Sequence, residues 1–108
     1  MVFNTGAALL DAIVLAVVSK EKDGTYGYKI TQEIKQALEL SESTLYPVLR
    51  RLQKENLCRT YDQPYQGRNR RYYSITEEGK AKLLDYRCQW MDHKNAIDVF
   101  LDVKRAKE

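Results

Sequence analysis

The sequence predicts a mainly α-helical domain with a small β-hairpin and a long last helix. Two changes of hydrophobic period predict this fold class. Apolar residues recur at helical spacing in the first half, alternate with polar residues after Asn56, and return to helical spacing after Thr76. With 108 residues, 44% of them hydrophobic, the chain is long enough for one domain with a modest core.

Positive charge is concentrated in the middle of the chain. The net charge is only +3, from 18 basic and 15 acidic residues. Residues 41–73 contain seven basic and three acidic residues, whereas the segments before and after carry net charges of −1 and 0. Because a localised positive patch attracts a polyanion better than a diffuse charge does, this segment is the place to look for a nucleic-acid contact.

The first helix should begin at a cap on Asn4 or Thr5 and end near Ser19. It is apolar almost all round, so it should lie in the middle of the fold or be covered by a partner chain. The apolar run is too short to span a membrane, is broken by Asp11 and lacks the flanks of a signal peptide, so we expect no membrane contact and a cytoplasmic location. The residues expected to face inward are Leu9, Leu10, Ile13, Val14 and Val17.

A turn at residues 22–24 should lead to a second helix over residues 26–38, capped by Thr25. Its inward residues would be Ile30, Ile34 and Leu38, which are spaced by four.

The third helix has two different faces. Leu45, Val48, Leu49 and Leu52 are spaced i, i+3, i+4 and i+7 and should be buried together. The opposite face offers cations for phosphates, and arginine and hydroxyl groups for base edges, so it suits DNA. An ordinary solvated face is the alternative. The outward residues are Ser43, Pro47, Arg50 and Lys54, flanked by Thr44, Tyr46 and Arg51.

Residues 57–62 and 71–75 alternate in polarity and are rich in Tyr, Thr and Ile, which predicts two short strands. The connection over residues 63–70 looks too long for a tight hairpin, and it carries Arg68, Asn69 and Arg70 beside a glycine. A solvated loop is the alternative for this basic tip. Three helices and a basic hairpin describe a winged helix-turn-helix, the DNA-binding domain that we assign to residues 1–76.

The last helix should be capped by Thr76 and occupy residues 77–108. A helix about 40 Å long overshoots a domain of this size, so part of its apolar stripe would remain uncovered in one chain. We therefore predict a dimerisation helix and a homodimer. The stripe, about 100° wide, consists of Leu83, Tyr86, Trp90, His93, Ile97, Phe100 and Leu101.

Nothing in the sequence indicates catalysis. His93 is the single histidine and lies on the apolar stripe, while Cys58 and Cys88 are far apart and fit no metal spacing. Without a nucleophile–base pair, paired carboxylates or a phosphate loop, we expect no enzyme, no cofactor and no metal site.

Three segments resemble the signatures of PadR-family transcriptional regulators. These are Tyr26-Gly27-Tyr28-x-Ile30, Ser43-Thr44-Leu45-Tyr46-Pro47-x-Leu49-x-Arg51-Leu52, and Arg70-Arg71-Tyr72-Tyr73-x-Ile75-Thr76-x-x-Gly79. Where many members have glycine after the third helix this chain has Asn56, which also tolerates a left-handed backbone. The resemblance implies a homodimer that binds pseudo-palindromic operator DNA and usually represses. The DNA-binding residues expected are Tyr26, Ser43, Thr44, Tyr46, Pro47, Arg50, Lys54, Arg68, Asn69 and Arg70.

Since the chain ends after one long helix, it is similar to the short PadR branch, which includes a lactococcal multidrug-sensing repressor. Some members of that branch stack flat aromatic ligands on a tryptophan of the last helix at the dimer axis. Trp90 occupies the corresponding place, so the resemblance implies a small aromatic effector. Two alternatives remain: Trp90 only packs, or the chain is a winged-helix protein–protein module that binds neither DNA nor ligand.

Overall fold

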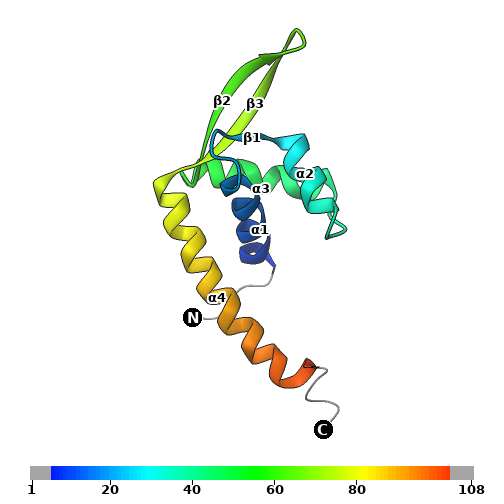
Figure 1. The fold of residues 1–108 in the computed structure, drawn as a ribbon, viewed down its shortest axis with the longest axis vertical. Coiled ribbons are helices and arrows are strands. Elements are labelled where there is room, and N and C mark those ends of the chain that lie inside the picture. The colour runs from blue at the N-terminus through cyan, green and yellow to red at the C-terminus, as the bar shows by residue number, and fades with distance from the viewer. Residues whose placement is uncertain (1–5, 103–108) are drawn as a thin grey trace.

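The computed structural model describes residues 6–102 as four helices and one three-stranded antiparallel sheet. The wing, formed by the second and third strands, and the last helix project in opposite directions (Figure 1). The Cα radius of gyration is therefore 16.0 Å, against about 13 Å for a compact chain of this length. The elements are α1 (Ala7–Ser19), β1 (Thr25–Tyr26), α2 (Gly27–Lys35), α3 (Glu42–Lys54), β2 (Cys58–Tyr65), β3 (Arg68–Ile75) and α4 (Glu77–Leu101).

Helix α1 lies in the middle of the fold and contacts α2, α3, α4 and β3 (Figure 1). Its predicted inward face was partly wrong, because Leu15 and Val18 are fully buried while Leu9, Leu10 and Ile13 are only half-buried. A helix that is apolar all round has no periodicity to select one face, so its neighbours decide which residues are covered. The caps predicted at Asn4 and Thr5 lie outside the described residues.

The second helix is shorter than predicted at both ends, because Tyr26 belongs to a strand and the helix ends three residues before Leu38. Thr25 pairs with Tyr73 and Tyr26 pairs with Tyr72, which places β1 beside β3 in the order β1-β3-β2. Helix α2 then ends at Lys35, and Leu38, predicted to face inward, is 42% exposed. Pairing with β3 thus takes Tyr26 out of the predicted helix, and the predicted cap at Thr25 was wrong, since the N-cap residue is Tyr26.

The wing is a tight hairpin, so the predicted long loop was wrong. Strands β2 and β3 pair from Cys58–Ile75 to Tyr65–Arg68 and are joined by the two residues Gln66 and Gly67. Both turn residues have positive φ, 50° and 80°, as the favoured two-residue hairpin turns require. Arg68, Asn69 and Arg70 are therefore strand residues.

Thr76 caps α4, as predicted, and also joins the start of this helix to the residues that follow α3. Thr76 Oγ1 accepts a hydrogen bond of 2.9 Å from the Gly79 amide and donates one of 2.7 Å to the carbonyl oxygen of Asn56. Asn56 has a left-handed φ of 63°, as expected of a residue in the place of a glycine.

An ion pair between Asp11 and Arg51 joins α1 to α3. Arg51 had been predicted beside the outward face of α3, but its guanidinium turns back to a carboxylate that is 6% exposed. The Arg51 Nε donates to Asp11 Oδ2 at 3.3 Å, and Nη2 contacts Oδ1 more closely. Arg51 is thus structural rather than part of the outward surface.

The two partners of this pair should differ in their effect on stability. Arg51→Met leaves a buried carboxylate uncompensated and should lower the free energy of unfolding by about 3–5 kcal/mol. Asp11→Asn should cost only about 1–2 kcal/mol, because the Arg51 side chain is 38% exposed and water can solvate it. Urea denaturation of both variants measures the difference. Equal losses, or a larger loss for Asp11→Asn, would contradict this account of the pair.

Candidate nucleic-acid interface

The predicted outward side chains of α3 share one exposed face. Leu45, Val48, Leu49 and Leu52 are buried at 0–3% exposure, which fixes the rotation of the helix about its axis. The opposite side therefore points away from the body of the protein. It exposes Ser43, Thr44, Pro47, Arg50 and Lys54.

The N-terminal turn of α3 presents a group of hydroxyls. Ser41 caps the helix by accepting a hydrogen bond of 3.3 Å from the Thr44 amide. Its Oγ also lies 2.9 Å from Ser43 Oγ and 3.1 Å from Thr44 Oγ1. Pro47 lies inside the helix, so the Ser43 carbonyl oxygen lacks its usual i+4 donor. Polar groups at the positive end of a helix dipole suit contact with a phosphate or a base edge.

Tyr46 connects α3 to the start of α2. Its ring lies directly against Gly27, where an added Cβ would be 2.8 Å from Tyr46 Cε1. Glycine at this position therefore allows the two helices to approach closely. Beside them a concavity of about 410 Å³ separates α3 from the wing. It is lined by Tyr26, Gly27, Tyr28, Tyr46, Arg70, Arg71 and Tyr73.

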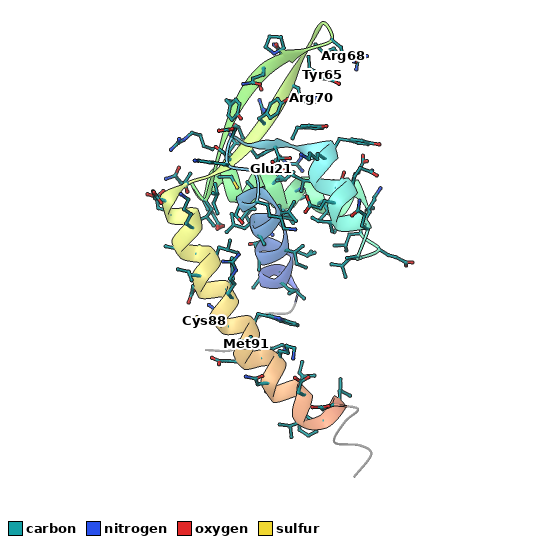
Figure 2. The ribbon with its side chains drawn as sticks, viewed as in Figure 1. Glu21, Tyr65, Arg68, Arg70, Cys88 and Met91 are labelled. Carbon is teal, nitrogen blue, oxygen red and sulfur yellow. The ribbon has the colours of Figure 1, made fainter. Side chains whose placement is uncertain are left out.

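The cations of the wing do not all point outward. Arg68 is exposed near the tip of the wing (Figure 2), and Asn69, the next residue of β3, is also exposed. Arg70 is half-buried, with its Cζ 3.9 Å from the ring centroid of Tyr26 and 3.5 Å from that of Tyr65. Arg71 forms an ion pair with Asp62 across the hairpin, with Nε 3.6 Å from Oδ1. Sequence reasoning grouped Arg68, Asn69 and Arg70 together, but alternation along β3 places Asn69 on the opposite face from the two arginines, and of these only Arg68 is fully exposed.

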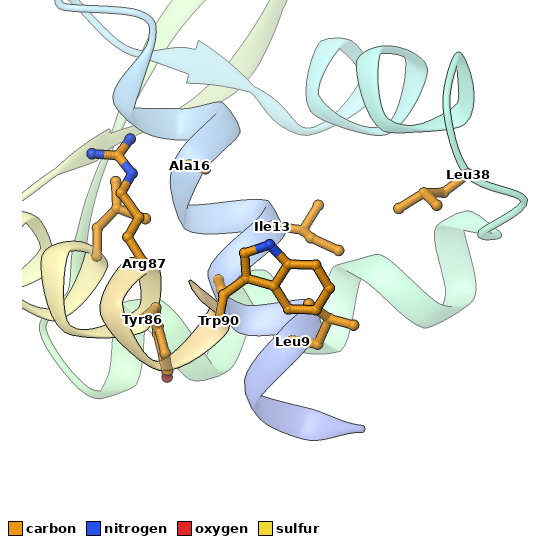
Figure 3. A pocket seen from close by; sticks show the side chains of 9 residues that line it. Leu9, Ile13, Ala16, Leu38, Tyr86, Arg87 and Trp90 are labelled. Atoms are coloured by element: carbon orange, nitrogen blue, oxygen red, sulfur yellow. The ribbon is translucent and has the colours of Figure 1, made fainter. Parts of the chain in front are cut away.

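The second predicted site lies on the other side of the molecule, between α1 and α4. Leu83, Tyr86 and Trp90 line an apolar cavity of about 380 Å³ (Figure 3). His93 has its ring 6.3 Å from that of Trp90, whereas Ile97, Phe100 and Leu101 lie further along α4 and are 37%, 85% and 71% exposed. The cavity residues that sequence reasoning did not assign to this site are Leu9, Ala12, Ile13, Ala16, Leu38 and Arg87.

Neither cysteine forms a disulfide. Cys58 is buried, and burial raises the pKa of its thiol to about 12, so this sulfur stays protonated at neutral pH. Cys88 is exposed on α4. Among residues 6–102, no cluster of three His, Cys, Asp or Glu side chains could hold a metal ion. In the same range no helix is long and apolar enough to cross a membrane.

The fold and sequence together establish the family. Residues 14–85, from α1 through the wing into α4, match the transcriptional regulator PadR-like family. The chain is a member of this family. This PadR-like regulator has the winged helix of a DNA-binding transcription regulator, and the resemblance noted from its three motifs is confirmed.

Solved structures show the same fold. The protein smu.1704 from Streptococcus mutans is similar at a TM-score of 0.80 with 39% identity, over 95% of each chain. A PadR family transcription regulator from Clostridium difficile has a TM-score of 0.76 and 30% identity over 85% of this chain and 97% of that one. Bacillus subtilis PadR, solved in complex with operator DNA, has a TM-score of 0.65 and 25% identity over 72% of this chain and 45% of that one.

Proposed function

We propose that this PadR-like regulator binds a pseudo-palindromic operator as a homodimer and represses transcription. Helix α3 would enter the major groove, and the tip of the wing would reach the adjacent backbone or minor groove. The observation that carries the proposal is the exposed face of α3, which has hydroxyls at one end and Arg50 and Lys54 along it. The Bacillus subtilis PadR complex with operator DNA supports the same class of partner.

The proposed contacts divide into two kinds. Arg50 and the hydroxyls of Ser43 and Thr44 would read base edges, because arginine and hydroxyl side chains suit donors and acceptors in the major groove. The other residues would hold the DNA backbone and fix the position of α3. They are Tyr26, Tyr46, Pro47, Lys54, Arg68 and Asn69.

Residues 1–76 would then be the DNA-binding domain, and residues 77–108 the dimerisation helix packed onto it through Leu83 and Tyr86. Beyond Tyr86, the apolar stripe of α4 is more exposed than before it, with Trp90 at 40%, Ile97 at 37% and Phe100 at 85%. A second copy related by a two-fold axis would cover this stripe with the same surface of its own chain. The two α3 helices would then lie about 34 Å apart, one turn of B-DNA.

Two substitutions separate base reading from backbone contact. A bound sequence is first selected from random duplexes, and its affinity is measured over a range of salt concentrations. Arg50→Ala should weaken that site by about 1–3 kcal/mol and relax its sequence preference. Arg68→Ala should weaken all sequences similarly and reduce the salt slope by about one unit, because one phosphate contact is lost.

Lys80→Ala is the control, since Lys80 is an exposed cation on α4 that belongs neither to the exposed face of α3 nor to the tip of the wing. It should bind as the wild type does. Unchanged binding by Arg50→Ala would show that α3 is not the reading helix, and failure to select any duplex would reject DNA binding itself.

We further propose that a planar aromatic compound binds beside Trp90 and lowers operator affinity. The cavity is apolar and of the size of small-molecule sites, and it lies between α1 and α4, so a ligand there could change how two protomers are spaced. The indole face favours flat or cationic aromatics by about 0.5–2 kcal/mol.

Trp90 is the single tryptophan, so its fluorescence reports on this site alone. Titration with Hoechst 33342 or ethidium should quench it and weaken operator binding, and Trp90→Leu should remove the effect on DNA. If quenching leaves operator affinity unchanged, or none of the dyes quenches, Trp90 serves packing.

A further inference from the structure

The outer half of the wing has little to hold it in place. Strand β1 pairs only with Tyr72 and Tyr73 of β3, so the segment over residues 62–71 is a ribbon of two strands. A two-stranded hairpin is marginally stable in water unless something else packs on it. The direction of the wing must therefore be fixed by side chains.

A continuous row of aromatic contacts covers one face of this sheet. Residues two apart on a strand share a face, so Arg70 and Tyr72 point the same way from β3. Tyr72 stacks on Tyr61 of β2, with centroids 5.4 Å apart at 12°, and meets Tyr26 of β1 edge-on at 5.6 Å. Tyr61 in turn donates a hydrogen bond to the carbonyl oxygen of Asp23, before β1. The base of the wing is thus joined to the body.

Arg70 extends that row toward the tip. Its guanidinium carbon lies 3.9 Å from the ring centroid of Tyr26 and 3.5 Å from that of Tyr65. Tyr65 is the last residue of β2, whereas Tyr26 immediately precedes α2. In Figure 2, Tyr65 and Arg70 lie one below the other on the wing, below Arg68. Arg70 therefore links the end of the wing to the residue from which the helix-turn-helix begins.

We infer that Arg70 is a positioning residue, which fixes the wing relative to α2 and α3 instead of contacting DNA. The inference rests on the proposed DNA binding for its effect on affinity, and it revises the expectation that Arg70 touches DNA. A guanidinium that stacks on two rings has its faces occupied, and its planar shape makes the contact specific for arginine.

Three variants distinguish positioning from a direct contact. Arg70→Gln removes the charge, Arg70→Lys keeps the charge but loses the planar stack, and Tyr65→Leu keeps the arginine but removes one ring. If Arg70 positions the wing, all three should weaken operator binding, by up to roughly 5- to 30-fold for the loss of both ring contacts. The salt slope should stay unchanged, whereas Arg68→Gln should reduce it by about one unit.

The double variant Arg70→Gln/Tyr65→Leu should bind little worse than Arg70→Gln, because both substitutions break the same link. A direct phosphate contact predicts the opposite pattern: Arg70→Lys and Tyr65→Leu would bind normally, and Arg70→Gln would reduce the salt slope. That pattern would overturn the inference.

A measurement without DNA tests the same link independently. Amide hydrogen exchange over residues 62–71 of the free protein should accelerate in Arg70→Gln and Tyr65→Leu but not in Arg68→Gln. Unchanged exchange in the first two would overturn the inference even if DNA binding is real. Faster exchange in a protein that binds no duplex would instead reject the proposed function and leave the role of Arg70 in the wing intact.

Discussion

Replacing both Ile97 and Phe100 by aspartate is expected to separate the proposed homodimer of this PadR-like regulator into monomers. In one chain these side chains are 37% and 85% exposed, and they lie on the same stripe of α4 as Trp90. A dimer interface there would have to bury two charges from each chain, four in all, without partners, which costs far more than the apolar contact returns. Sedimentation should then show a mass of 12.6 kDa in place of twice that value.

Operator affinity should fall with the dimer. Two linked α3 helices bind as a bivalent unit, and loss of the link can weaken binding by about 10²–10⁴-fold. The control is Met91→Asp/Asn95→Asp, which adds two charges to the opposite side of α4, where both residues are exposed. This control should stay dimeric. A dimeric Ile97→Asp/Phe100→Asp variant would place the interface elsewhere.

The helices were predictable where two faces differ in polarity. Helix α3 agrees with the spacing of Leu45, Val48, Leu49 and Leu52, all of which are buried. In α1, which is apolar almost all round, the same reasoning was right for Val14 and Val17 but missed the buried Leu15 and Val18. The buried carboxylate of Asp11 forms an ion pair with Arg51, which is 40 residues away in the sequence. Sequence spacing carries no information about such a pairing.

The wing shows a second limit of the sequence. Pro64 and the charges on either side of the turn obscured the ends of both strands, because proline usually marks a strand as ended. In the structure Pro64 belongs to β2 and lies opposite Asn69 of β3. Because β2 is an edge strand, it tolerates the backbone N–H that proline lacks. The positive φ of Gln66 and Gly67 closes the hairpin in two residues. The cations predicted in one loop, Arg68 and Arg70, are therefore strand residues on the same face of β3, where Arg68 is exposed and Arg70 is half-buried.

The sequence predicted the candidate DNA surface correctly on α3 but only in part on the wing. Exposure of Arg50 follows from helical geometry alone, because its opposite face is apolar. The position of Arg70 depends on Tyr26, which the sequence placed in a helix and the structure places in β1. A local pattern could not show that these residues would meet.

Gly79→Ala should be strongly destabilising, although alanine in a helix normally stabilises. Gly79 lies in the first turn of α4, where a Cβ would overlap the carbonyl oxygen of Leu57 and lie 2.7 Å from Ile75 Cγ1. That oxygen cannot easily retreat, because it accepts hydrogen bonds of 3.1 Å from both the amide and the hydroxyl of Thr76. The overlap is therefore with backbone that the fold holds in place.

We expect Gly79→Ala to lower the free energy of unfolding by about 2–4 kcal/mol and the melting temperature by about 10–20 °C. Gly67→Ala is the matched comparison: a Cβ there meets nothing within 4 Å, so the cost is only the positive φ of 80°, about 1–2 kcal/mol. Thermal unfolding of both variants shows which substitution lowers the stability more. If Gly79→Ala instead gains the roughly 1 kcal/mol that helix propensity gives, α4 does not pack on the Leu57 carbonyl as closely as the structure has it.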